Sequence, residues 1–317
     1  MPRDPAVDRA IYRNVFHKIF FMFPVNPKKS LGQHFLADNN IARKITSSLT
    51  GTGYDHVVEI GPGTGILTEY LVRNHDFTTH LVEIDGESVD FLRKRFPEMK
   101  ERISQEDFLR FNLSGKFSAP IAIIGNFPYN ISSQIFFRIL ENRNIVKEVV
   151  CMVQKEVAER ITAPPGSRTY GILSVLLQAF YETRYLFGVG RKVFIPPPRV
   201  MSAVISLTRK PEVNLRCDEE MFFRVVKTAF NQRRKMLRNS LSAFLEKKVK
   251  NHGSIVSGGP AGAKTGSGIL KGRPANGETA PIVQKPANTG MEKLLSCRPE
   301  QLGTDDFVKL TNFIVSI

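Results

Sequence analysis

Short apolar runs alternate along residues 31–195 with longer stretches in which apolar residues recur every three or four positions. The short runs have the length and β-branched character of buried strands, and the longer stretches have the period of helices. The expected strands are His56–Ile60, His80–Ile84, Ile121–Ile124 and Val149–Val153, and the expected helices include Ile66–Val72 and Ser88–Phe96. Strands that alternate with helices predict an α/β fold with a parallel sheet covered on both faces.

The pattern changes after three consecutive prolines at 196–198. Val200–Leu207 has the character of one more strand, Met221–Leu245 has helical spacing, and Thr304–Ile314 predicts a short amphipathic helix. Residues 251–290 are rich in Gly, Ser, Pro and Ala, which is typical of a flexible insertion. The predicted organisation is an extension at 1–25, an α/β domain at 26–208, and a smaller, mostly helical domain at 209–317 interrupted by 251–290.

A glycine-rich turn, Gly61-Pro62-Gly63-Thr64-Gly65, follows the first expected strand. Its glycines would let the backbone approach a ligand closely. The preceding acid, Glu59, would repel a pyrophosphate but suits a cation such as S-adenosylmethionine, which carries a sulfonium and an ammonium. Glu83 ends the next strand, where an acid accepts hydrogen bonds from ribose hydroxyls. Asp107 follows at a position suited to an adenine amino group. For the glycine-rich turn alone, an ordinary strand-to-helix turn is the alternative.

The tetrapeptide Asn126-Phe127-Pro128-Tyr129 follows another expected strand, so it should lie beside the glycine-rich turn. The exocyclic nitrogen of adenine is a poor nucleophile because its lone pair is delocalised into the ring. The Asn126 side-chain oxygen and a backbone carbonyl, that of Phe127, could accept its hydrogens. Tyr129 could stack on an extruded base. The sequence thus predicts methyl transfer to adenine governed mainly by positioning, unless the tetrapeptide is simply a turn.

These motifs together resemble the KsgA family of ribosomal RNA adenine dimethyltransferases. The similarity spans residues 26–250 and 291–317, and its segments are 26–36, 59–68, 82–85, 125–132, 154–160, 170–175, 194–200, 233–239 and 298–302. The resemblance implies a Rossmann-like, S-adenosylmethionine-dependent methyltransferase domain and a small helical domain. It implies dimethylation of two adjacent adenines near the 3′ end of 16S rRNA, and a checkpoint role in small-subunit assembly. Phe127 stands where Leu is common in the family.

Motif position assigns further residues by resemblance. The cofactor contacts would be His34, Leu36, Gly61, Glu83, Asp107 and Asn126, in addition to Glu59, Gly63 and Gly65 of the turn. Phe194 would form the second wall of the adenine pocket, opposite Tyr129.

The net charge of +15 favours a polyanionic partner. The charge is uneven, because residues 31–100 carry 7 basic and 10 acidic groups and residues 199–250 carry 13 and 5. We expect the RNA phosphates to meet Lys28, Lys29, Arg191, Lys192, Arg233, Arg234, Lys235 and Arg238. A solvated charged face is the alternative.

Several classes of function are disfavoured. No apolar run approaches the roughly 18 residues of a membrane span, and three dispersed cysteines exclude a disulfide scaffold. The histidines show no metal spacing, so we expect no metal site. We also expect a cytoplasmic monomer, and the resemblance implies that it acts on the small ribosomal subunit. Three alternatives stay open: a methylase of large-subunit rRNA, a DNA adenine methylase, and a non-catalytic assembly factor.

Overall fold

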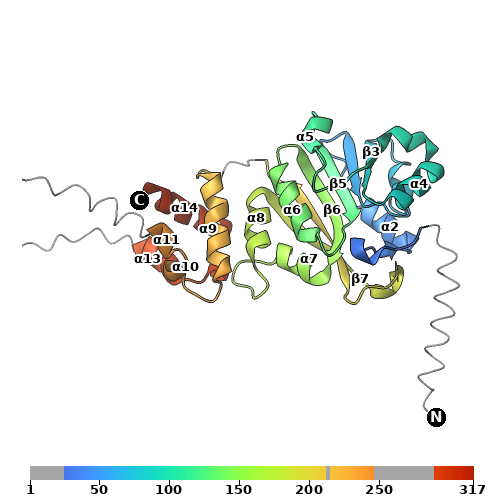
Figure 1. Cartoon of the computed structure of the whole chain (residues 1–317). Coiled ribbons are helices and arrows are strands. Elements are labelled where there is room, and N and C mark those ends of the chain that lie inside the picture. Colours follow the sequence, from blue (N-terminus) through green and yellow to red (C-terminus); the bar gives the residue numbers. More distant parts are fainter. Residues whose placement is uncertain (1–24, 212–214, 246–288) are drawn as a thin grey trace, which may run out of the picture. The chain divides into compact units, whose positions relative to one another are not determined.

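The protein is described by a computed structural model that covers residues 25–211, 215–245 and 289–317 (Figure 1). The chain divides into two compact units, one ending at Leu215 and the other beginning at Arg216. This division lies slightly beyond the predicted boundary at 208. The proposed extension 1–25 and insertion 251–290 fall almost wholly outside the described residues. Val25 is buried, however, and residues 289 and 290 belong to a helix.

The first unit is built around a sheet of seven strands. In chain order these are β2 (His56–Ile60), β3 (Thr78–Glu83), β4 (Ile103–Gln105), β5 (Ile121–Asn126), β6 (Val146–Gln154), β7 (Tyr181–Val189) and β9 (Ser202–Arg209). Their spatial order is β4-β3-β2-β5-β6-β9-β7. The first five in this order are parallel, whereas β9 runs antiparallel to both β6 and β7. The chain order reverses between β2 and β5, which makes this point the topological switch of the sheet.

The predicted strands are confirmed, but the prediction of a parallel sheet needs correction at one edge. β9 inserts antiparallel between β6 and β7. The sequence pattern did not indicate β7, because most of its positions are exposed or half-buried and it lacks the apolar run of a central strand. β4 was also missed, since it has only three residues.

Helices cover both faces of this sheet. They are α2 (Asn39–Thr46), α3 (Thr68–Leu71), α4 (Gly86–Arg95), α5 (Leu113–Lys116), α6 (Ser132–Glu141), α7 (Lys155–Thr162) and α8 (Ile172–Phe180), with short turns η1 (Lys29–Leu31), η2 (Pro97–Arg102) and η3 (Arg191–Val193). Side chains of α2 and α3 share one apolar cluster with Val57, Ile124 and Val150 of the sheet. The helices α6 and α8 pack together on the opposite face (Figure 1). Burial of the central strands on both faces fixes the position of their carboxyl ends.

A second, two-stranded pairing joins distant parts of the chain. β1 (Phe35–Leu36) runs antiparallel to β8 (Phe194–Ile195), with Leu36 opposite Phe194. The N-terminal segment, residues 25–36, includes β1. It is anchored by Lys28, which forms an ion pair with Asp85, and by a hydrogen bond of 3.1 Å from Asn26 N to Glu87 Oε1. These contacts hold the segment next to the end of β3, and a hydrogen bond from Asn126 to His34 O holds it at the end of β5.

The second unit is helical. Its elements are α9 (Glu219–Asn231), α10 (Leu237–Ser240), α11 (Ser242–Leu245), α13 (Thr289–Ser296), η4 (Pro299–Gln301) and α14 (Thr304–Ser316). The expected helix Thr304–Ile314 is confirmed by α14. The stretch 221–245 is not one helix, because α9 ends at Asn231 and a turn follows. Leu237 N donates to Cys297 O over 2.9 Å, and both Phe230 and Leu237 are buried, so packing within this unit overrides the local helical period.

No helix among the described residues is long and apolar enough to cross a bilayer.

Candidate functional site

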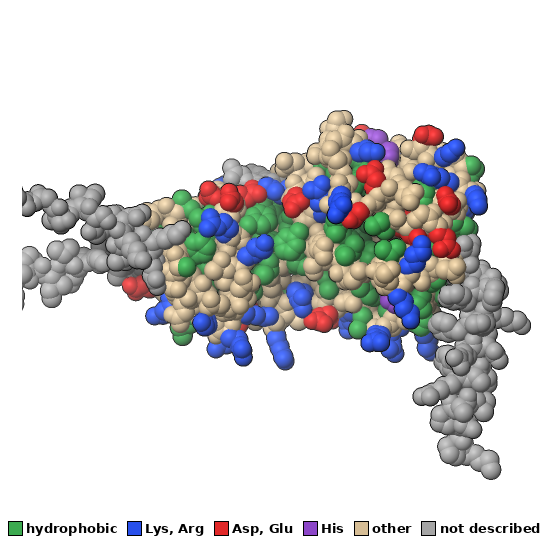
Figure 2. Space-filling view, viewed as in Figure 1, with side chains coloured by type: hydrophobic (Ala, Val, Ile, Leu, Met, Phe, Trp, Pro, Cys, Tyr) green, Lys and Arg blue, Asp and Glu red, His purple; other side chains and the backbone are tan. Residues whose placement is uncertain are grey.

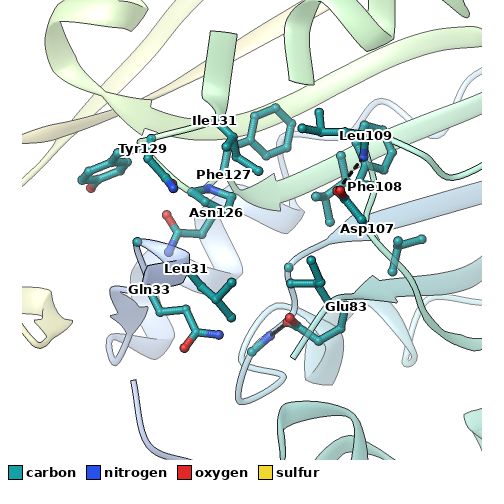
Figure 3. Close-up of a pocket in the computed structure, with 18 of the residues that line it drawn as sticks. Leu31, Gln33, Glu83, Asp107, Phe108, Leu109, Asn126, Phe127, Tyr129 and Ile131 are labelled. Carbon is teal, nitrogen blue, oxygen red and sulfur yellow. Dashed lines mark hydrogen bonds between the residues drawn. The ribbon is translucent and has the colours of Figure 1, made fainter. Parts of the chain in front are cut away.

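A cavity of about 270 Å³ lies at the carboxyl ends of β2, β3 and β5 (Figure 3). Its walls come from the N-terminal segment, the glycine-rich turn, the end of β3, the loop after β4 and the tetrapeptide after β5. The lining includes Ser30–Phe35, Ile60, Gly61, Gly63, Val82–Ile84, Glu106–Leu109 and Asn126–Ile131. The fold thus brings together motifs almost a hundred residues apart, at the place where doubly wound sheets bind ligands.

The glycines of the turn have different surroundings. Gly61 has φ +62°, and a Cβ built there would meet no atom within 4 Å, so its position opens onto the cavity. Gly63 has φ +57°, and a Cβ there would fall 2.7 Å from Cε1 of Phe35. Gly65 does not line the cavity and packs against Phe96 instead. Two of the three predicted glycines therefore line the cavity, and the third allows close packing of the turn.

Glu83 is the central carboxylate of the cavity, and its residue is only 3% exposed. Oε2 accepts a hydrogen bond from Gly63 N at 3.0 Å, and Oε1 accepts one from Asp85 N at 2.9 Å. Burial raises the pKa of this carboxyl above its ordinary value, while the backbone donors of Asp85, Gly63 and Ile84 oppose the shift. A carboxylate has about four acceptor sites, so acceptor capacity remains for a ribose hydroxyl.

Glu59 lies elsewhere than the sequence suggested. It is 1% exposed, it does not line the cavity, and its Oε2 accepts a hydrogen bond of 2.6 Å from Thr68 Oγ1. Burial raises the pKa of Glu59 to about 8. The side chain therefore supports the turn from beneath and does not present a charge to a cationic ligand.

Asp107 lines the cavity where adenine recognition was predicted. Its Oδ1 accepts from Leu109 N at 2.9 Å, which fixes the loop after β4 and leaves the second oxygen available (Figure 3). Phe108, Leu109 and Ile84 supply apolar lining, and Ile84 is 49% exposed. A flat base with an exocyclic amino group fits this combination of apolar walls and one acceptor.

Asn126, the last residue of β5, is held in a defined orientation. Its Nδ2 donates to the backbone oxygen of His34 over 2.8 Å, and only an N–H can face a carbonyl in this way. The other amide atom, Oδ1, is buried and has no hydrogen-bond partner among the described residues. Buried polar atoms are rarely left without a partner, so Oδ1 is an acceptor available to a ligand.

The rest of the tetrapeptide divides between core and cavity. The Phe127 residue is 1% exposed and its ring contacts Phe136 at 5.8 Å between centroids, so the side chain anchors the loop. Pro128 and Tyr129 line the cavity together with part of Phe127. The Tyr129 ring stacks on His34 with centroids 5.6 Å apart and planes at 30°. Burial raises the pKa of the Tyr129 phenol.

Leu36 and Phe194 lie in the core, in contrast to the roles assigned by resemblance. Leu36 is 3% exposed, Phe194 is 1% exposed, and both belong to the apolar cluster under the sheet. Neither lines the cavity, because the pairing of β1 with β8 directs them into that cluster. His34, in contrast, does line the cavity.

The predicted RNA-binding residues also differ in their surroundings. Lys28 forms an ion pair with Asp85, whose side chain is 1% exposed, so this lysine closes the N-terminal segment. Lys29, Arg191 and Lys192 are exposed on the first unit, and Figure 2 shows Lys and Arg side chains projecting over the surface.

In the second unit, Arg233, Arg234 and Lys235 lie on the turn after α9, not on a long helix. Arg233 Nε lies 3.7 Å from Glu300 Oε2, and Arg238, in α10, donates to Ser296 Oγ.

Two residues near the site received no role from the sequence. Gly125 begins the motif segment 125–132, and a Cβ there would lie 2.5 Å from the backbone oxygen of Ile60, so no larger residue fits beside β2. A glycine inside a buried strand is the available signal for such close approach. Ser202, whose Oγ is hydrogen-bonded to the Tyr129 hydroxyl, had no signal in the sequence pattern. Among the described residues no group of three or more His, Cys, Asp or Glu could hold a metal ion.

The strand order, the single reversed strand β9 and the acid-lined cavity define the class as a Rossmann-like, S-adenosylmethionine-dependent methyltransferase. The cavity residues fit this cofactor, because Gly61 leaves space, Glu83 has free acceptor sites and Asp107 faces the same cavity. Two solved structures share the fold. A dimethyladenosine transferase from Plasmodium falciparum has a TM-score of 0.66 and 24% identity, covering 87% of this chain and 96% of its own. The 23S rRNA methyltransferase ErmE has a TM-score of 0.56 and 22% identity, covering 87% and 99%.

Sequence comparison gives the family. The model of the ribosomal RNA adenine dimethylase family matches residues 25–256, and the chain belongs to this family. It is 57% identical over 224 residues to a protein of Flavobacterium johnsoniae, covering 70% of this chain and 85% of the relative. It is 47% identical over 288 residues to one of Parabacteroides distasonis, covering 90% and 93%. Both relatives are described as ribosomal RNA small subunit methyltransferase A. The chain is thus a methyltransferase of adenine in ribosomal RNA.

Proposed function

We propose that this enzyme dimethylates N6 of two adjacent adenines near the 3′ end of the small-subunit 16S rRNA. The names of the relatives from Flavobacterium and Parabacteroides support the choice of subunit. The proposal includes action as a monomer in the cytoplasm, without a metal, on a subunit still under assembly. The observation that carries the chemistry is the buried Asn126 Oδ1, which has no hydrogen-bond partner in the part of the chain that the structure describes, at the edge of a cavity suited to the cofactor.

Binding of the cofactor is assigned to the residues around the end of β3. Glu83 would accept from the ribose hydroxyls, Asp107 would accept from the adenine amino group, and Gly61 would allow close approach of the backbone. His34 and Gly63 complete this wall. When bound, S-adenosylmethionine supplies an electrophilic methyl group on a sulfonium.

The tetrapeptide would hold the target base. Asn126 Oδ1 would accept a hydrogen bond from the N6 amino group, which draws electron density toward the nitrogen and orients its lone pair. The Phe127 carbonyl is assigned as a second acceptor, and Tyr129 would stack on the extruded base. Such stacking is worth about 1–3 kcal/mol per base. Each transfer releases one proton from N6, and catalysis comes mainly from orientation.

Exposed basic side chains would bind the RNA backbone. Lys29, Arg191 and Lys192 would contact phosphates from the first unit, and Arg234 and Lys235 would do so from the second. Arg233 and Arg238 would join them while keeping their contacts with Glu300 and Ser296. Phosphate contacts fix orientation and make binding salt-dependent, while the cavity selects the base. Lys28 is assigned to the N-terminal segment and not to RNA, because of its ion pair with Asp85.

The test is methyl transfer from labelled S-adenosylmethionine to small subunits purified from a strain that lacks this modification. Large subunits and duplex DNA serve as parallel substrates. We expect label in small-subunit RNA, at two adjacent adenines. Label confined to large-subunit RNA would favour a methylase of the other subunit, and label confined to DNA would favour a DNA methylase. Binding of small subunits without any transfer would favour a non-catalytic assembly factor.

A further inference from the structure

Ser202 lies at the start of β9, outside the predicted motifs, and its residue is fully buried. The strand pairs on both sides at this point, with Ser202 opposite Gln154 of β6 and Val189 of β7. Lys155 N also donates to the oxygen of the preceding residue, Met201, over 2.9 Å. The Ser202 backbone is therefore fixed by strand pairing on both sides.

From this fixed point, the Ser202 Oγ forms a hydrogen bond with the hydroxyl of Tyr129. At the other side of the phenol, the ring stacks on His34. His34 is itself held, because its Nδ1 lies 2.8 Å from Pro196 O, and a carbonyl can only accept. Tyr129 is thus restrained at its hydroxyl by β9 and at its ring by the N-terminal segment. Without these restraints, the loop that carries Tyr129 would leave its side chain free to change rotamer.

We propose that Ser202 is a positioning residue that fixes the ring plane of Tyr129 for stacking on the target adenine. The inference rests on the proposed role of Tyr129 as the stacking partner of the base. With its hydroxyl bonded to Ser202, Tyr129 can offer the base its π-face. Stacking tolerates changes at the edge of a base, so the same stacking contact serves an adenine that already carries one methyl group. Ser202 would therefore support both transfers of the dimethylation.

A double-mutant cycle tests this coupling. Ser202→Ala and Tyr129→Phe each delete one partner of the same hydrogen bond, and the double variant deletes both. We expect each single change to lower the single-turnover rate of methyl transfer by about fivefold, the order expected for one hydrogen bond. The double variant should be no slower than the single variants, and the affinity for S-adenosylmethionine should be unchanged. Ser206→Ala, at another well-buried position of β9, is the matched control and should keep the wild-type rate.

A second measurement reads stacking directly. A short RNA hairpin with 2-aminopurine in place of the target adenine should lose fluorescence on binding, and Ser202→Ala should weaken that loss. An additive fall in the double variant, or a wild-type rate in Tyr129→Phe, would overturn the proposal, and the latter outcome decides even if Ser202→Ala fails to fold. If the wild-type enzyme methylates large-subunit RNA instead, the proposed target fails, and the cycle is run on that RNA. If it methylates no RNA, the 2-aminopurine fluorescence of the wild type, the two single variants and the double variant decides whether Ser202 and Tyr129 are coupled.

Discussion

Removal of the Asn126 side chain separates a catalytic role from a structural one. Asn126→Ala loses the 2.8 Å hydrogen bond from Nδ2 to His34 O and leaves that partly buried carbonyl without this donor, which costs about 1–3 kcal/mol. The same change removes the buried Oδ1, which is unpaired among the residues described in the structure, and removal of such an atom returns about 1–3 kcal/mol. The two contributions nearly cancel, so the free energy of unfolding should hardly change. The rate of methyl transfer should nevertheless fall by about 10²–10³-fold, as when one preorganised hydrogen-bonding group is deleted from an active site.

The assay combines thermal unfolding with single-turnover methyl transfer. For a domain of this size about 1 kcal/mol corresponds to roughly 2–4 °C in Tm, so Asn126→Ala should melt within about 3 °C of wild type. The matched control is Asn142→Ala. Asn142 is 9% exposed and its Nδ2 donates to Arg138 O over 2.9 Å, but neither of its amide atoms is buried without a partner. The control should lose about 1 kcal/mol of stability and keep its activity.

Two results would refute this reasoning. If Asn126→Ala melts well below Asn142→Ala and its activity follows the folded fraction, the Asn126 amide is a structural group. If Asn126→Ala methylates at the wild-type rate, the free oxygen is not the acceptor for N6.

Three further predictions concern the turn and its acids. Glu83→Gln should weaken binding of S-adenosylhomocysteine at least about tenfold by calorimetry, because the new amide N–H₂ must face backbone donors that the carboxylate accepts; unchanged affinity would exclude Glu83 from the cofactor site. Gly63→Ala should lower Tm more than Gly61→Ala, because the new Cβ at position 63 would lie 2.7 Å from the Phe35 ring. Gly61→Ala should chiefly abolish cofactor binding. Equal melting temperatures of the two variants would contradict this difference. Glu59, whose pKa burial raises from 4.5 to about 8, holds a proton that the unfolded chain releases, so wild-type stability should fall between these pH values by at most about 1.4 kcal/mol per pH unit. Glu59→Gln should show a flatter dependence of Tm on pH than the wild type. Parallel curves of Tm against pH for the two proteins would show that this carboxyl does not cause the loss of stability.

The sequence was most informative where backbone chemistry determines the residue type. Glycine at 61 and 63, each with positive φ, marked the turn correctly, and the acid at the end of β3 lines the cavity. The place of the tetrapeptide beside the turn followed from the order of strands and helices. Side-chain direction was not predictable in the same way. Glu59 lies one residue from the carboxyl end of β2, yet it faces Thr68 under the turn, because adjacent strand residues point to opposite faces.

Contacts between distant segments account for the remaining differences. No local pattern could show that Phe194 pairs with Leu36 and enters the core, or that Lys28 forms an ion pair with Asp85. The Ser202 contact with the tetrapeptide is likewise tertiary. A basic residue in the sequence therefore indicates a charge, while its partner decides whether that charge is available to RNA.

The most direct test identifies the modified nucleoside made by the enzyme. Undermethylated small subunits are incubated with S-adenosylmethionine, and the digested RNA is examined by mass spectrometry for the wild-type enzyme and for Asn126→Ala. The cavity chemistry predicts N6,N6-dimethyladenosine from the wild type, and none from Asn126→Ala although that variant still binds S-adenosylhomocysteine. Unmodified adenines with the wild-type enzyme, or methylation of another base, would contradict it.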